Sequence, residues 1–261
     1  MSADQSRGIS DDPEVVAAAR LVDAAERIVV LTGAGISTDS GIPDFRGPQG
    51  VWTRNPEAEK QSTLSYYRSD PEVRKRSWLS RLDHQTWAAE PNAGHEALVA
   101  LQRRRKLSLL VTQNIDGLHQ LAGSDPDRVV EIHGTMRETA CLSCGDRRPM
   151  RETLDRVRAG EEDPPCEVCG GILKSATISF GQQLVEADID RAYDAAARCD
   201  LMLAIGSTLQ VFPAANVVPI AALAGAAVII VNRDPTEMDP IADVVVRASI
   251  SDVLPRICGA P

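Results

Sequence analysis

Aromatic residues and long apolar runs are scarce in this chain. Phe, Trp and Tyr together make up 3% of the 261 residues. The longest apolar runs, such as residues 226–231, fall far short of the ~20 residues needed to span a bilayer. The N-terminus is polar and acidic and lacks the apolar segment of an export signal. These absences predict a cytoplasmic protein without a membrane partner.

Positive charge is in deficit. The 28 lysines and arginines are outnumbered by 37 aspartates and glutamates, which gives a formal net charge of -9. A protein that coats nucleic-acid phosphates needs the opposite balance, so we expect no nucleic-acid partner. The one basic run, residues 103–106, directly precedes an apolar run and is typical of a solvated helix C-terminus. An acidic surface suits a substrate that carries lysines.

Cysteine is limited to six residues, and in a chain without an export signal they do not indicate a disulfide framework. Four of them form two C-x-x-C pairs separated by 21 residues: Cys141, Cys144, Cys166 and Cys169. This spacing predicts a tetrahedral zinc site, and four protein ligands leave no open position, so the zinc is expected to be structural. A thiol redox pair and an iron centre are the alternatives. Cys199 and Cys258 stand alone beside apolar residues and are interpreted as core residues.

Short β-branched and apolar runs recur along the chain and predict buried strands. They span residues 27–32, 107–112, 129–132, 201–205, 226–231 and 244–246. Helical stretches are predicted between several of them, at residues 13–26, 92–103, 188–197 and 214–223. Strands that alternate with helices indicate an α/β fold with a Rossmann-like parallel sheet covered on both faces.

Two segments interrupt this alternation. Residues 48–91 hold all three tryptophans and two of the three tyrosines, and residues 137–173 hold the paired cysteines and three prolines. We expect these segments to pack together as a smaller zinc-ribbon and helical lobe, inserted over the carboxyl edge of the sheet. The remaining residues 1–47, 92–136 and 174–261 are expected to form the discontinuous Rossmann-like domain.

A glycine-rich turn follows the first predicted strand. The residues Gly33-Ala34-Gly35-Ile36-Ser37 could leave free backbone N–H groups and the positive end of a helix dipole facing a pyrophosphate. The fragment is a weak signal by itself, because Thr38 stands where a third small residue belongs and no acid ends a second strand ~20 residues later. Taken alone, it also fits a purely structural strand-to-helix turn.

The longer stretch decides between these interpretations. Residues 33–47 read Gly-Ala-Gly-Ile-Ser-Thr-Asp-Ser-Gly-Ile-Pro-Asp-Phe-Arg-Gly and resemble the signature stretch of the sirtuins without a mismatch. Further motifs follow in the family's order: Thr-Gln-Asn-Ile-Asp-Gly-Leu-His at 112–119, Gly-Ser-Thr-Leu-Gln-Val at 206–211 and Val-Asn-Arg-Asp at 231–234. His133-Gly134 matches the position of the family's catalytic histidine. The 206–211 motif and residues 73–78 resemble the class II branch, which includes a mitochondrial sirtuin.

The resemblance implies an enzyme, an NAD-dependent protein-lysine deacylase (deacetylase) that converts NAD and an acyl-lysine protein or peptide into nicotinamide, O-acyl-ADP-ribose and free lysine. NAD is then a co-substrate and one Zn²⁺ is structural. In the family reaction the acyl oxygen attacks the nicotinamide ribose carbon, and a histidine deprotonates a ribose hydroxyl. His133 is expected to be that base, since an imidazole pKa near 6.5 suits the task. Asn114 and Asp116 are expected to hold the nicotinamide ribose.

The resemblance also assigns contacts to NAD. They are Gly33, Ala34, Gly35, Ile36, Asp44, Phe45, Arg46, Gln113, Asn114, Ile115, Asp116, Gly206, Ser207, Thr208, Asn232, Arg233, Asp234 and Ile250. Phe45 would shield the nicotinamide ribose, Arg46 would steady phosphate charge, and Ile250 would contact adenine through its backbone. The other histidines, His84, His95 and His119, are given structural roles.

The sequence departs from the family pattern after the zinc site. Ser179 replaces an aromatic residue and Gln182 replaces a glutamate in a stretch that normally pairs, strand to strand, with the substrate peptide. Trp78-x-x-Arg81 could line an acyl pocket and attract an acidic acyl tail; the alternative is an amphipathic surface helix. Protein mono-ADP-ribosylation and a non-enzymatic zinc and NAD module are the competing functions. The sequence predicts neither the acyl preference nor the oligomeric state.

Overall fold

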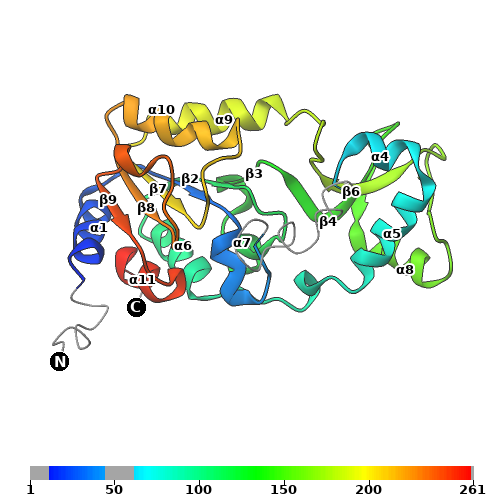
Figure 1. Cartoon of the computed structure of the whole chain (residues 1–261), viewed down its shortest axis with the longest axis horizontal. Helices are drawn as coiled ribbons and strands as arrows, with labels where there is room; N and C mark the ends of the chain where they lie inside the picture. Colours follow the sequence, from blue (N-terminus) through cyan, green and yellow to red (C-terminus); the bar gives the residue numbers. More distant parts are fainter. Residues whose placement is uncertain (1–11, 45–61, 260–261) are drawn as a thin grey trace.

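The structure is a computed structural model that describes residues 12–44 and 62–259. Its larger sheet has six parallel strands in the order β3-β2-β1-β7-β8-β9 (Figure 1). The strands are β1 Ile28–Thr32, β2 Leu107–Thr112, β3 Val129–Glu131, β7 Leu201–Ile205, β8 Ala227–Val231 and β9 Val244–Val246. The strand order reverses between β1 and β7, and such a switch point is where open α/β sheets bind ligands. The predicted parallel sheet is confirmed.

Helices cover both faces of this sheet, as predicted (Figure 1). One face carries α1 Pro13–Ala24, α6 Ala93–Arg103 and α11 Ile250–Ile257, and the other carries α9 Glu186–Ala196 and α10 Val217–Leu223. Successive residues of β1 point to opposite faces, so Val30 belongs to the first core and Val29 to the second. Cys258 and Cys199 lie buried in these two cores, so both are core residues as expected.

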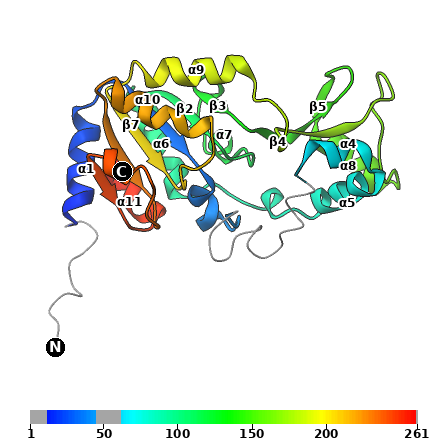
Figure 2. The same ribbon diagram turned by 45° about the horizontal axis from the view of Figure 1, so that its top comes forward.

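The second sheet lies at the other end of the molecule (Figure 2). Its three antiparallel strands have the order β5-β4-β6, with bounds β4 Gly134–Cys141, β5 Arg147–Pro149 and β6 Leu173–Thr177. Three helices accompany it: α4 Leu64–Ser69, α5 Pro71–Leu82 and α8 Met150–Arg158. We call this sheet and its helices the small lobe. Its core joins Trp78 of α5 to Cys141, Met150 and Leu154, so the two interrupting segments pack together.

Short helices complete the chain. They are η2 Ala34–Ser40, η3 Gln85–Trp87, α7 Leu118–Leu121, η4 Pro126–Arg128, η5 Ala214–Asn216 and η6 Asp239–Ile241. The exact division of the chain into domains stays a prediction, and the small sheet extends across the predicted boundaries, from Gly134 in β4 to Thr177 in β6. Within the described residues, no helix has the length and apolar character needed to cross a membrane.

Candidate active site

The predicted site segments meet at the carboxyl edge of the large sheet. Segments 33–37, 113–116, 206–208 and 232–234 follow β1, β2, β7 and β8, and His133 follows β3. Because these five strands are neighbours, the residues after them lie along one continuous edge. The structure therefore brings together most of the residues that the sequence motifs selected.

The turns after β1 and β7 are packed backbone to backbone. The Gly33 N–H donates to the Ile205 carbonyl at 2.9 Å, and the Gly35 N–H donates to the Gly206 carbonyl at 2.8 Å. A Cβ on Gly33 would lie 2.7 Å from the Gly206 oxygen, and one on Gly35 would lie 2.7 Å from the Gly206 Cα. The expectation that these two glycines present free N–H groups to a pyrophosphate is wrong. Their N–H groups and their lack of a Cβ serve the contact between the two turns.

A buried serine joins the two residues expected to hold the nicotinamide ribose. The Ser37 hydroxyl donates to the Asp116 carboxylate at 2.8 Å and accepts the Asn114 side-chain amide at 3.1 Å. The Asn114 amide also donates to the Gly33 carbonyl at 3.1 Å, and the other Asp116 oxygen accepts the Leu118 N–H at 2.9 Å. Both side chains are thus fixed before any ligand arrives. Ser37 was not among the predicted site residues, because its burial and partners cannot be seen in a motif.

His133 is held in the orientation of a general base. Its Nδ1 lies 2.9 Å from the Gln113 carbonyl, which can only accept, so Nδ1 carries the hydrogen. Nε2 then bears a lone pair. Burial lowers the pKa of His133, while the bond to Gln113 raises it, and the net shift is downward from 6.5. The ring is therefore neutral at pH 7 and able to take a proton.

The two sheets meet at this histidine. The His133 carbonyl accepts the Ile178 N–H at 2.7 Å, one residue beyond β6. Gly134 has φ of +72°, and a Cβ there would run into the Ala176 carbonyl of β6. Glycine after the histidine is thus required for β6 to approach. On the opposite side, the Gln113 side chain donates to the Ser207 hydroxyl at 3.0 Å, which ties the edge of β2 to that of β7.

The remaining predicted NAD contacts have mixed surroundings. Asn232 bonds the Asp234 carbonyl at 2.8 Å, and both Asp234 and its neighbour Arg233 are exposed. Ile250 starts α11 and is 8% exposed, with its side chain in the core. Asp44 lies in the loop after η2, whereas Phe45 and Arg46 lie outside the described residues. The NAD-contact roles of all these residues stay predictions.

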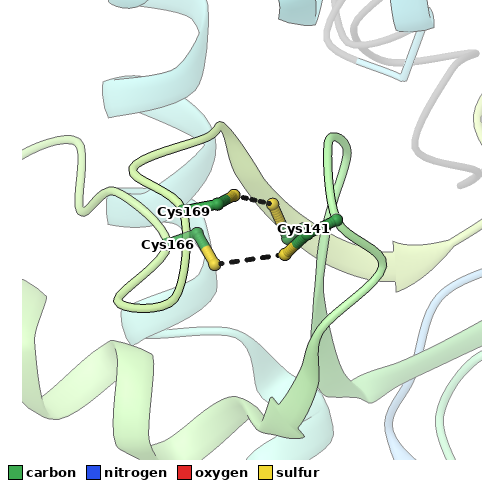
Figure 3. A group of neighbouring side chains, drawn as sticks. Cys141, Cys166 and Cys169 are labelled. Atoms are coloured by element: carbon green, nitrogen blue, oxygen red, sulfur yellow. Dashed lines mark hydrogen bonds between the residues drawn. The ribbon is translucent and has the colours of Figure 1, made fainter.

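Four thiols of the small lobe converge on one point (Figure 3). All four sulfur atoms lie within 4.8 Å of one another, from Cys141, Cys144, Cys166 and Cys169. The Cys141–Cys169 and Cys144–Cys166 sulfur pairs are 3.5 and 3.7 Å apart, far beyond an S–S bond. A tetrahedral Zn²⁺ with Zn–S distances of ~2.3 Å places its sulfurs ~3.8 Å apart. The four cysteines therefore fit a structural zinc ion, as predicted.

The Trp78–Arg81 segment belongs to α5, an amphipathic helix that buries Trp78 and exposes Leu79, so the alternative interpretation is confirmed and the aromatic pocket wall is not. Trp78 is 1% exposed and packs in the small-lobe core with the zinc-site residue Cys141. Arg81 turns toward β6, where its guanidinium lies 3.4 Å from the Ser175 hydroxyl. Trp78 fails to line a pocket because its ring supplies the largest side chain of a small core.

The stretch expected to pair with a substrate peptide is partly engaged within the chain. The Phe180 N–H donates to the Ser62 carbonyl at 2.8 Å, and the Phe180 carbonyl accepts the Leu64 N–H at 3.0 Å. Gln182 folds back, and its side chain accepts the Ser179 N–H at 3.3 Å. The backbone N–H and carbonyl of Phe180 are thus already used. A substrate peptide would have to pair with residues beside Phe180.

Together, the sheet edge and the zinc lobe define a dinucleotide-type α/β enzyme fold with a metal-braced insertion. The Sir2 family profile matches residues 33–213. An NAD-dependent protein deacetylase 2 of Streptomyces coelicolor is 49% identical over 88% of this chain and 95% of its own. A solved structure described as "Structural Basis for the Mechanism and Regulation of Sir2 Enzymes" has a TM-score of 0.84, with 38% identity over 95% of this chain and 97% of that one.

A second solved structure, a Sir2–p53 peptide–NAD+ complex, has a TM-score of 0.80 and 31% identity, covering 91% of this chain and 94% of its own. The match of the family profile extends over more than half of the chain and includes the turns at Gly33 and Gly206. The chain belongs to the Sir2 family.

Proposed function

We propose that this protein is an NAD-dependent protein-lysine deacylase and that it removes acetyl groups. The observation that carries the proposal is the placement of His133. Its Nδ1–H bond to the Gln113 carbonyl leaves Nε2 free, at the same sheet edge as the Ser37–Asn114–Asp116 network. A neutral imidazole and a fixed carboxylate at the carboxyl edge of a parallel sheet suit a reaction on a bound ribose.

The chain's own residues have separate tasks in this reaction. Bound NAD supplies a ribose carbon from which nicotinamide can leave. Asn114 and Asp116 orient that ribose, and Ser37 keeps both side chains in place. Nε2 of His133 takes the proton from a ribose hydroxyl, and the Gln113 carbonyl stabilises the resulting imidazolium through Nδ1–H.

The substrate is an acylated lysine in a protein or peptide. The formal net charge of -9 favours approach of a lysine-bearing chain and gives no reason to expect nucleic acid. The Sir2–p53 peptide–NAD+ complex supports a peptide as the acyl donor. We place the protein in the cytoplasm and in the class II branch on the sequence features that predicted both, and we assign NAD contact to segments 33–36, 113–116, 206–208 and 232–234.

The test is one incubation of the zinc-loaded protein with NAD and an acetyl-lysine peptide. We expect nicotinamide, O-acyl-ADP-ribose and free-lysine peptide in equal amounts. ADP-ribose attached to protein, with the peptide still acetylated, would instead support mono-ADP-ribosylation. Unchanged NAD would support a binding module and contradict both enzymatic functions.

A pair of cations in the small lobe bears on the acyl chain. Lys174 is 4% exposed, and burial together with the nearby charge of Arg81 lowers its pKa to about 8. Within the described residues, Arg81 and Lys174 make no ion pair, and Arg81 Nε has no hydrogen-bond partner. Lys174 Nζ donates to the Thr177 carbonyl and Arg81 contacts Ser175, so both cations lie beside the strand that leads to Ile178 and the His133 region.

We therefore propose acidic acyl chains as candidate substrates beside acetyl. A panel of acetyl, longer-chain and succinyl peptides at one enzyme concentration, repeated with Arg81→Met, tests this. A succinyl preference that Arg81→Met removes would support the proposal. Equal use of all chains by the wild type would contradict it without affecting the assignment of deacylation.

A further inference from the structure

Two histidines that the proposed reaction does not use lie buried beside the candidate active site. His95 of α6 is 0% exposed and His119 of α7 is 1% exposed, and their ring centroids are 4.9 Å apart. Burial lowers the pKa of both rings, that of His95 to about 4, so both are neutral at pH 7. A neutral imidazole has one N–H and one bare nitrogen. The surrounding hydrogen bonds therefore determine where each proton lies.

The bonds at the ends of β1 and β2 assign the proton of His119. The Thr32 hydroxyl donates its only hydrogen to the Thr112 hydroxyl at 2.8 Å. His119 Nε2 lies 2.9 Å from the same Thr32 oxygen. Because the Thr32 hydrogen is already used, Nε2 must be the donor, and Nδ1 is bare. Thr112 also accepts the Asn114 N–H at 3.1 Å, so the chain of bonds runs from His119 to the Asn114 backbone.

His95 lies beside His119 at the start of α6. The Asn92 N–H reaches Nδ1 of His95 at 3.3 Å and closes a capping box at the start of α6. Nδ1 also lies 3.2 Å from the Asn92 Oδ1, which can only accept, so either tautomer of His95 has a partner at Nδ1. Across residues 12–44 and 62–259, neither His95 Nε2 nor His119 Nδ1 has a hydrogen-bond partner. His119 Nδ1 is an acceptor, and the adjacent His95 can satisfy it directly through an Nε2–H or through one bridging water molecule.

The same chain of bonds reaches the glycine-rich turn. The side-chain amide of Asn92 donates to the Ile36 carbonyl at 2.8 Å and to the Ser40 hydroxyl at 2.9 Å. The start of α6 is therefore bonded to η2, while the His119 end is bonded to the segment that carries Asn114. Both segments flank the expected position of the nicotinamide ribose.

We propose that His119 is a positioning residue of the deacylation site: as the neutral Nε2–H tautomer it orients Thr32 and Thr112, and through them the backbone of Asn114. His95 holds the other nitrogen of His119 in place. The inference rests on the proposed function, since Asn114 is taken to orient the ribose. It adds a directed chain of buried hydrogen bonds that no motif residue reveals by itself.

The tautomers can be measured without any substrate. The chain has only four histidines, so full-length, zinc-loaded protein labelled with ¹⁵N-histidine gives few ring signals, each assignable by replacing one histidine with glutamine. At pH 7.5 we expect both His95 and His119 to be neutral, with His119 protonated on Nε2. A hydrogen on Nδ1 of His119, or a cationic ring at either position, would overturn the proposal. Because NAD is absent, this result stands whether or not the protein deacylates.

Kinetics on a matched pair of variants then test the positioning role. Thr32→Val keeps the shape and removes the hydroxyl, and we expect kcat to fall about tenfold, with an unchanged KM for the peptide and a shifted Asn114 amide resonance. Thr32→Ser keeps the hydroxyl and should restore both the kcat and the Asn114 amide resonance of the wild type. His119→Gln, which retains a hydrogen-bond donor, should likewise have a higher kcat than His119→Phe. A folded, zinc-loaded Thr32→Val with wild-type kcat would overturn the positioning role, whereas a wild type that leaves NAD unchanged would overturn only the proposed function.

Discussion

Among the described residues, the large sheet lies between two apolar cores of 24 and 20 buried residues, whereas the small lobe has one cluster of seven, two of them zinc-site cysteines. A core of 44 residues can stabilise its sheet by burial alone. A core of seven cannot offset the ordering of three strands and three helices without a further contribution, and metal coordination supplies it. The candidate active site lies where these unequal parts meet, at the hydrogen bond between the His133 carbonyl and the Ile178 N–H. Activity can therefore be lost when the small lobe unfolds, while the large sheet stays folded.

Removing the zinc should have the largest effect. Structural zinc sites contribute on the order of 10 kcal/mol to folding, more than the small-lobe core can replace. Treatment with a chelator should abolish deacylation and unfold the small lobe, while the parallel sheet keeps its far-UV circular dichroism. Hydrogen exchange localises the change: amides of β4 and β6 lose protection and those of β1 and β7 keep it. Full activity after complete metal removal would contradict this difference between the parts.

A truncation in each core sharpens the same comparison. Trp78→Ala in the small lobe and Leu98→Ala in the first core of the large sheet should cost ~3–5 and ~2–5 kcal/mol of unfolding free energy. Only Trp78→Ala should also weaken zinc retention, because Trp78 packs against Cys141. Urea denaturation combined with a competition assay for zinc checks both. Equal zinc retention in the two variants would show that the lobe does not depend on this core.

Ser37→Ala tests the network at the edge of the large sheet. It removes the hydrogen bonds that hold Asn114 and Asp116, so kcat should fall about tenfold or more with little loss of stability. Asp39→Ala, on the exposed side of the same short helix, is the matched control and should retain wild-type turnover. Steady-state kinetics with NAD and an acetyl-lysine peptide separate the two. If both variants behaved alike, the buried network would have no part in the reaction.

The smallest effect is expected from a change of one pH unit, and it concerns the unfolding free energy. Burial lowers the pKa of all four histidines, so between pH 6.5 and about 4 the folded chain binds fewer protons than the unfolded chain and loses stability as pH falls. Glu131 opposes this: burial raises its pKa to about 7, and its contribution is lost as pH rises from 4.5 through 7. The four histidines outnumber this one glutamate, so their effect on the unfolding free energy is the larger. The unfolding free energy should therefore fall from pH 7 to pH 5, by roughly 1.4 kcal/mol per pH unit per net proton. Urea titrations at pH 7, 6 and 5 measure this slope, and a flat profile would contradict it.

The contrast between the large sheet and the small lobe also explains which strands and helices the sequence could predict. Fully buried parallel strands are unbroken apolar runs, and β1, β2, β7 and β8 lie within one residue of their predicted bounds. The strand β4 has a mixed pattern, Gly-Thr-Met-Arg-Glu-Thr-Ala-Cys, and was not predicted, because its pairing is set by β6 and by the metal site. Its neighbour α8 was missed for the same reason.

At the site, the motifs predicted which residues gather but not how they bond. The zinc ligands were predicted from spacing because two C-x-x-C pairs permit few other arrangements. The bonds of Ser37 and the use of the Gly33 and Gly35 N–H groups depend on Asp116, Ile205 and Gly206, which lie far away in the sequence. The burial of Trp78 likewise depends on a core assembled from two separate segments.

The replacement of His133 by alanine tests the central claim most directly. In one reaction with NAD and an acetyl-lysine peptide, the wild type should release free-lysine peptide, nicotinamide and O-acyl-ADP-ribose in equal amounts. His133→Ala should fold, retain its zinc and form free-lysine peptide at least about 100-fold more slowly, because it lacks the imidazole that takes the ribose proton. Unchanged turnover by a folded, zinc-loaded His133→Ala would remove His133 from the mechanism and contradict the account.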